Sequence, residues 1–117
     1  MTATGDFDPQ VMARLKTLGG SALVGKLAAV FGEFARDRVR DAAQAGAQGD
    51  LDGLARAAHS VRSSAGNVGA LRLHAIATEL EASARAGQAP APGRLDDLQA
   101  AFVAATTWLA DITREAA

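Results

Sequence analysis

The segment A-H-S-V-R-S-S-A-G-N-V-G, residues 58–69, predicts an amphipathic helix with a histidine on its polar side. Apolar residues recur around it at intervals of three and four, which is the spacing of one helix face: Leu54, Ala58, Val61, Ala65 and Val68. At about 100° per residue, His59 lies roughly 140° from the middle of that face. We therefore expect the imidazole to face solvent or a partner, not the core.

The residues that share the predicted face of His59 are small. Ser63 and Gly66 follow it by one and two helical turns, and Ala55 precedes it by one turn. Arg62 flanks the histidine at i+3. This pattern predicts an exposed imidazole among short side chains, with one cation at the rim.

The rest of the chain predicts helices joined by short connections. Asp8-Pro9 has the form of a helix start, and Gly19-Gly20 ends this first, short helix. Longer helical patterns follow, separated by a break at residues 46–49, a turn at Gly69 and a loop at residues 87–93: 22–45, 50–68, 73–84 and 95–112. Since short connections favour antiparallel neighbours, we expect an all-α fold, an antiparallel up-down four-helix bundle with a short additional N-terminal helix. Residues 1–7 are expected to be flexible, and residues 8–117 to form a single domain.

Composition excludes several classes of function. A net charge of −1 gives no reason to expect nucleic-acid binding. The absence of cysteine excludes disulfides, thiolate zinc sites and thiol catalysis. No run approaches the roughly 18 apolar residues of a membrane span, and the N-terminus lacks a signal-peptide pattern. We therefore expect a cytoplasmic, monomeric protein that binds neither metal nor membrane.

The predicted histidine face suits phosphoryl chemistry. A neutral imidazole is a nucleophile near neutral pH and can form covalent intermediates. Phosphoryl transfer depends mainly on positioning and charge stabilisation. The nitrogen must protrude, its surroundings must leave room for a donor, and a cation should meet the phosphoryl oxygens. His59, the small residues around it and the planar guanidinium of Arg62 match these three needs.

At these residues the chain resembles the histidine-containing phosphotransfer (HPt) domain family of two-component phosphorelays. The family pattern is roughly A-H-x-L-K-G-S-A-x-x-x-G-A-x-x-L with a downstream L-E pair. The residues that match it are Ala58, His59, Val61, Arg62, Ser64, Ala65, Gly69, Ala70, Leu73, Leu80 and Glu81. Arg62 stands where the family usually has Lys, and Ser63 where it usually has Gly.

The resemblance implies that His59 accepts a phosphoryl group from a receiver-domain aspartate and passes it to the receiver of another response regulator. Arg62 would stabilise the phosphoryl group. Ser63 departs from the family's Gly, and three roles stay open for it: a hydrogen bond to the phosphoryl group, which would also stabilise it, a hydrogen bond to the imidazole, or a narrower choice of partner. The partner surface would include Ala55, Ser63, Gly66, Asn67 and, from the first helix, Met12. The partners implied are receiver domains of response regulators or of a hybrid histidine kinase. The chain itself would have no kinase activity, ATP site or cofactor, and Mg²⁺ would be bound by the receiver.

Two other functions remain open from the residues. The chain could be the phosphoacceptor hairpin of a dimeric histidine kinase, although Ser60 stands where such hairpins carry an acidic residue. It could also be a helical adaptor without phosphate chemistry. His74 lies outside the motif and is interpreted as a bystander. Residues 20–26 match the spacing G-x-x-x-x-G-K, but Leu27 replaces the Ser or Thr that binds Mg²⁺, and no strand precedes them.

Overall fold

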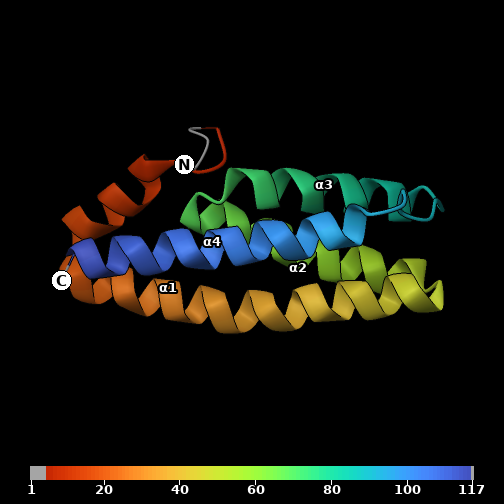
Figure 1. Ribbon diagram of the computed structural model, residues 1–117, viewed down its shortest axis with the longest axis horizontal. Coiled ribbons are helices and arrows are strands. Elements are labelled where there is room, and N and C mark those ends of the chain that lie inside the picture. Colours follow the sequence, from red (N-terminus) through yellow and green to blue (C-terminus); the bar gives the residue numbers. More distant parts are fainter. Residues whose placement is uncertain (1–4, 117) are drawn as a thin grey trace.

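The computed structural model describes residues 5–116, which fold into four helices (Figure 1). They are α1 (Pro9–Gln48), α2 (Leu51–Val68), α3 (Leu71–Arg85) and α4 (Arg94–Ala116). Helix α2 packs against α1 and α3, and α4 packs against the same two helices from the other side. The helices therefore form an antiparallel bundle in which α2 lies between α1 and α3. The prediction of an all-α four-helix bundle is confirmed.

The ends of α2 follow from its sequence. Asp50 caps the helix, because its Oδ1 accepts a hydrogen bond of 2.9 Å from the backbone N–H of Gly53. Gly69 ends it with φ at 80°, in the left-handed region that glycine adopts without strain. The apolar stripe between these caps is buried, with Leu54 and Val61 at 1% or less exposure. These features fix the rotation of α2 about its own axis.

Helix α1 is bent at Gly20, which has φ of 72° and ψ of −168°. Only glycine adopts this conformation readily, so the predicted break at Gly19-Gly20 takes the form of a kink between two helical segments. The predicted break at residues 46–49 is wrong in part, because α1 continues to Gln48 and ends at Gly49. Gly46 stays helical, and Leu95 of α4 packs directly on its Cα.

Residues 5–19, here called the N-terminal leg, fold back across one end of the bundle (Figure 1). Phe7 is 8% exposed and stacks on Trp108 of α4 with ring centroids 4.6 Å apart. The backbone N–H of Asp8 donates to the carbonyl of Gly69 at 2.8 Å. The prediction that Phe7 is flexible is therefore wrong. Residues 1–4, for which flexibility was also predicted, lie outside the described part of the chain.

Met12 is also buried by this arrangement, with 2% of its surface exposed. The prediction that Met12 contributes to an exposed partner surface is wrong. The physical reason is the kink at Gly20, which turns the apolar side of the leg onto the end of the core instead of leaving it beside α2.

Helix α1 contains one stretch that is long and apolar enough to cross a membrane by length and composition, with a mean hydropathy of 1.3. The expectation that no run approaches this length is therefore wrong. A single stretch of this kind is weak evidence for a span. Only 17% of it is buried, and the inward positions of α1 that the bundle covers include Val24, Phe31, Ala35 and Val39. The stretch does not indicate a membrane protein.

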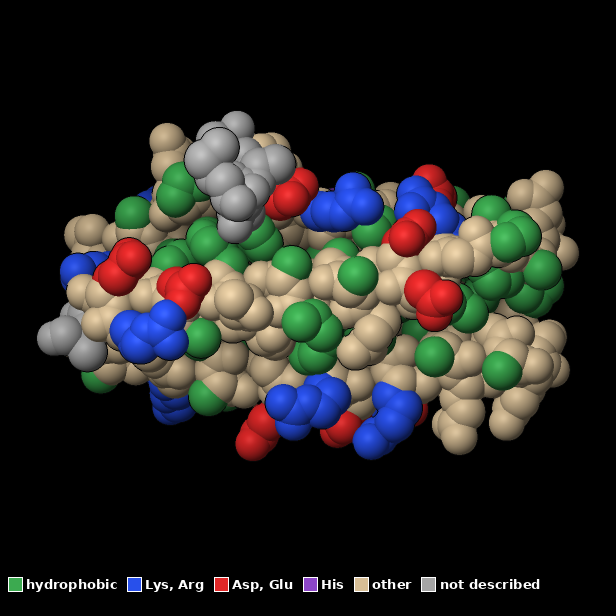
Figure 2. Space-filling view, viewed as in Figure 1, with side chains coloured by type: hydrophobic (Ala, Val, Ile, Leu, Met, Phe, Trp, Pro, Cys, Tyr) green, Lys and Arg blue, Asp and Glu red, His purple; other side chains and the backbone are tan. Residues whose placement is uncertain are grey.

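The face shown in Figure 2, with α4 in front, carries separate charged groups of both signs. Along α1 opposite charges pair locally, as in Arg40 with Asp37 at 3.1 Å and Arg38 with Asp41 at 3.3 Å. No histidine side chain is visible in this view. The histidine motif belongs to α2, which lies behind α4 in this orientation (Figure 1).

Candidate functional site

His59 lies on the outward side of α2, and its side chain is 50% exposed. The neighbouring core positions Ala58 and Val61 are fully buried, so the helix has the rotation that the apolar spacing predicts. Ser63, Gly66 and Asn67 are all exposed and follow His59 along the same helix. The predicted exposure of these four residues is confirmed.

Ala55 is only 4% exposed, and its predicted place on an exposed surface is wrong. Residues 55 and 62 are seven apart and lie on the same flank of α2. Helix α3 packs along this flank, where Arg62 contacts Glu81. The short methyl side chain of Ala55 is covered by this packing and belongs to the core.

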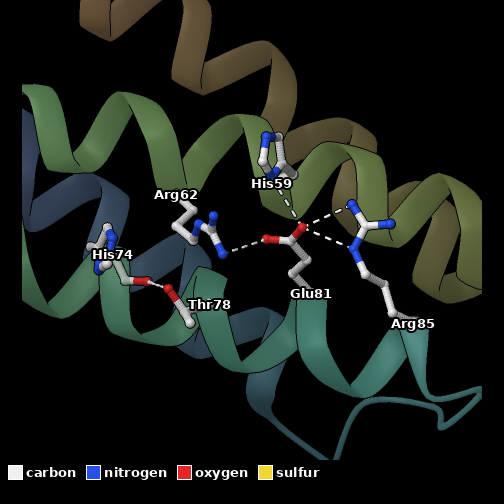
Figure 3. Close-up of polar contacts among 6 residues, drawn as sticks. All are labelled: His59, Arg62, His74, Thr78, Glu81 and Arg85. Carbon is white, nitrogen blue, oxygen red and sulfur yellow. Dashed lines mark hydrogen bonds and ion pairs between the residues drawn. The ribbon is translucent and has the colours of Figure 1, made fainter.

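Glu81 of α3 is the centre of the polar contacts around His59 (Figure 3). Its side chain is 8% exposed, and it is the one charged residue that is buried within residues 5–115. Oε2 lies 3.0 Å from Nδ1 of His59 and 2.9 Å from Nε of Arg85. Oε1 lies 3.1 Å from a terminal guanidinium nitrogen of Arg62. One buried carboxylate thus holds the imidazole and two arginines.

These contacts decide the ionisation of Glu81. Burial by itself raises the pKa of the carboxyl, but hydrogen bonds from Arg85 and His59 and the charge of Arg62 outweigh burial, so that the pKa is lowered from its ordinary value. The group is therefore an ionised carboxylate at neutral pH. An ionised carboxylate can only accept hydrogen bonds.

The ionised carboxylate also decides the tautomer of His59. Because Glu81 can only accept, Nδ1 of His59 carries the hydrogen in this contact. In the neutral imidazole the lone pair then lies on Nε2. Figure 3 shows this second ring nitrogen on the side of the ring away from Glu81. The site therefore presents a nucleophilic nitrogen outward.

The sequence motif included Glu81 but gave it no role, and Arg85 was missed. A signal was available for Glu81, since it lies among the inward positions Ala77, Leu80 and Ala84 of α3. A carboxylate on an apolar face predicts a buried polar partner. Arg85 follows Glu81 at i+4, the spacing of a helical ion pair.

Two grooves border α1 and α2 on the other flank of the histidine helix. The apolar groove is lined by Leu27, Val30, Phe31, Phe34, Ser64, Asn67 and Val68. The polar groove follows it along the same two helices, with lining residues that include Arg38, Asp41, Gln44, Arg56 and Ser60. Val30 and Phe34 are exposed although they are large and apolar. The histidine thus stands between a charged flank at α3 and a partly apolar flank at α1.

His74 lies apart from the contacts that join His59, Arg62 and Arg85 to Glu81 (Figure 3). It is half-buried on α3, and its ring approaches α2 at Gly66, where a Cβ atom would be 3.5 Å from it. No group of three or more His, Asp or Glu side chains that could hold a metal ion occurs in residues 5–116.

Fold and site together define a helical bundle that presents one tethered, half-exposed histidine. A family model of the Hpt domain matches residues 26–112, which is most of the chain. The chain therefore belongs to the Hpt domain family, whose members act in histidine phosphotransfer.

The solved structures include a close match over the whole chain. It is the crystal structure of histidine-containing phosphotransfer protein B (HptB) from Pseudomonas aeruginosa PAO1, with a TM-score of 0.87 and 25% sequence identity. The alignment covers 97% of this chain and 98% of that one, so the N-terminal part is included in the likeness. A search among curated proteins found no match.

Proposed function

We propose that this chain is a phosphocarrier that accepts a phosphoryl group on Nε2 of His59 from the aspartate of one receiver domain and passes it to another receiver. The observation that carries the proposal is the contact of 3.0 Å between Nδ1 of His59 and the buried carboxylate of Glu81. It fixes the tautomer whose free lone pair is on Nε2. Membership of the Hpt domain family favours this function over a kinase hairpin and over a helical adaptor.

The transfer follows from the geometry. The Nε2 lone pair attacks the phosphorus of the partner's aspartyl phosphate, the bond from phosphorus to the aspartate oxygen breaks, and a free carboxylate leaves. The Nδ1 proton remains in place, so the phosphorylated ring carries a positive charge next to Glu81. In the reverse reaction, an aspartate oxygen of a second receiver attacks the phosphorus. The bond from phosphorus to Nε2 breaks, and its electron pair returns to Nε2. In this scheme the chain supplies no kinase activity, and the Mg²⁺ belongs to the receiver.

Arg62 and Ser63 are the proposed phosphoryl-stabilising residues. Both lie on α2 within about one turn of His59, and both have solvent access. The guanidinium of Arg62 can offer a planar pair of N–H donors to phosphoryl oxygens. The Ser63 hydroxyl can donate one more hydrogen bond.

The proposed receiver surface consists of the exposed residues around His59 together with the apolar groove. Ser63, Gly66 and Asn67 have short or flexible side chains, which leaves room for the rim of another protein's active site. Val30 and Phe34 supply the exposed apolar area that protein interfaces bury at their centre. We further propose that the chain acts in the cytoplasm as a monomer, because one copy carries every residue used here.

The test is phosphoryl labelling of the chain by a phosphorylated receiver domain and by the small donor phosphoramidate. Wild type and His74→Gln should acquire acid-labile, base-stable phosphate, and His59→Gln should acquire none. His74→Gln is the matched control because it removes the other histidine of the chain. Labelling that persists in His59→Gln, or phosphate with the stability of a serine ester, would contradict the assignment.

A further inference from the structure

We propose that Arg85 is a positioning residue for His59: it is the permanent counter-ion of Glu81 and thereby leaves Arg62 free to bind the phosphoryl group. This inference rests on the proposed function. It assigns different roles to two arginines that contact the same carboxylate.

The two arginines hold Glu81 in different ways. Arg85 places two nitrogens on Oε2, with Nε at 2.9 Å and a terminal nitrogen at 2.8 Å. Arg62 approaches Oε1 at 3.1 Å as an ion pair. Oε1 nevertheless has no hydrogen-bond partner within residues 5–116. Arg85 is therefore bonded to the carboxylate, whereas Arg62 is held mainly by charge.

A buried carboxylate needs at least one cation that stays. Removing all compensation from a buried charge is costly, so Glu81 would protonate or move if both arginines left it. A phosphoryl group on Nε2 brings negative charge to the outer side of the ring and attracts the nearest mobile cation. When Arg62 turns toward this group, Arg85 keeps Glu81 ionised and in contact with Nδ1.

Helix α3 prepares Arg85 for this role. Glu81 precedes Arg85 by four residues, which is the favourable order for an ion pair on a helix. Arg85 is also the last residue of α3, where the helix dipole favours a cation. Both residues belong to one helix, so their contact can persist while Arg62 on α2 changes partner. Figure 3 shows Arg62 and Arg85 on opposite sides of the histidine.

The charge of Arg85 also bears on Arg62, because both guanidinium groups contact the same carboxylate. Without Arg85, Glu81 keeps Arg62 as its one remaining arginine partner among these contacts. Arg62 then cannot turn toward the phosphoryl group without leaving a buried charge less compensated, which is costly. The phosphoryl group on Nε2 would lack the cation that stabilises it.

The experiment measures the rate of His59 phosphorylation by phosphoramidate. The variants are Arg85→Gln, Arg85→Lys, Glu81→Gln and the double variant, with Arg72→Gln, an exposed arginine of the same helix, as the matched control. We expect Arg85→Gln to lower the rate about threefold, because Glu81 then retains Arg62. Arg85→Lys should restore most of the wild-type rate, because it keeps the charge.

The decisive comparison is between backgrounds. In the Glu81→Gln protein the further change Arg85→Gln should have no effect on the rate, because Arg85 acts through the carboxylate. An equal loss in both backgrounds would overturn the proposal and show that Arg85 acts on the donor directly. A wild-type rate for Arg85→Gln would overturn it as well.

The outcome also separates this inference from the proposed function. If wild type acquires phosphate on His59 and only the Arg85 variants behave unexpectedly, the phosphocarrier function stands and the role of Arg85 is refuted. If wild type acquires no phosphate on His59 from either donor, the proposed function is refuted and the role of Arg85 with it.

Discussion

The two flanks of α2 differ in what they bury. Toward α3, a carboxylate is enclosed, hydrogen-bonded to His59 and Arg85, and paired by charge with Arg62. Toward α1, Val30 and Phe34 stay exposed beside small polar residues of α2. The first flank determines the chemical state of His59, and the second offers area to a partner. Reactivity and docking can thus be separated across a single helix, with the histidine between them.

Substitutions at two adjacent residues of α3 should differ most in their effect on the free energy of unfolding. Leu80 is 1% exposed in the core, and Leu80→Ala should lower the free energy of unfolding by about 3 kcal/mol, because it removes buried contacts and leaves a cavity. Glu81→Leu should change it by less than about 1 kcal/mol, since the partners left behind have side chains 38–58% exposed and can be hydrated. Urea denaturation measures both values. A large loss in Glu81→Leu would mean that the ion cluster has mainly a structural role.

The next effect separates docking from chemistry. Phe34→Asp should slow transfer from a phosphorylated receiver at least about tenfold, because it places a charge in the apolar groove. The rate with phosphoramidate should not change, since this small donor needs no docking surface. Stopped-flow or gel-based transfer assays with the two donors provide the comparison.

The control for this variant is Val103→Asp, which changes an exposed apolar residue on α4. It should leave both rates at the wild-type level. Equal losses in Phe34→Asp with both donors would contradict the division between the flanks.

A smaller effect is expected at Ser63, on the exposed side of α2 between the flanks. Ser63→Ala should lower the rate of phosphoryl acceptance about threefold, which corresponds to one ordinary hydrogen bond. Ser60→Ala, whose side chain lines the polar groove, is the matched control and should behave as wild type. A faster rate in Ser63→Ala would show that the hydroxyl obstructs the donor.

The smallest effect concerns pH and stability. Burial raises the pKa of the Glu81 carboxyl, but the hydrogen bonds from Arg85 and His59 and the charge of Arg62 outweigh burial. The pKa is therefore lowered from its ordinary value of 4.5. A lowered folded-state pKa means that the ionised group stabilises the fold above 4.5 and that this contribution is lost as the pH falls through the folded-state value. Below pH 4.5, wild type should therefore lose stability more steeply than Glu81→Gln. Denaturation curves at several acidic pH values test this; parallel curves for the two proteins would contradict it.

Local signals made much of the fold predictable from the sequence. Asp50 and Gly69 bound α2 through contacts within a few residues, and the apolar spacing between them sets the outward position of His59. Gly20 marked a break for the same reason, because its conformation is a property of one residue. Such features need no knowledge of the neighbouring helices.

The errors arose where a distant segment decides the environment. Ala55 is covered by α3, and Phe7 and Met12 are buried because the N-terminal leg folds onto the end of the bundle. The contact of Glu81 with His59 joins residues 22 apart and depends on the register between α2 and α3. Periodicity within one helix does not contain that register. The family resemblance included Glu81 in the motif, but only the packing of α3 against α2 shows that it contacts His59.

The stacking of Phe7 on Trp108 has a practical consequence. The chain has a single tryptophan, and its indole lies against the leg that Gly20 attaches to the rest of α1. Intrinsic fluorescence of the chain therefore comes from one known place and changes when the leg detaches. A spectroscopist can follow this end of the molecule without attaching a dye, while the imidazole undergoes its own reaction.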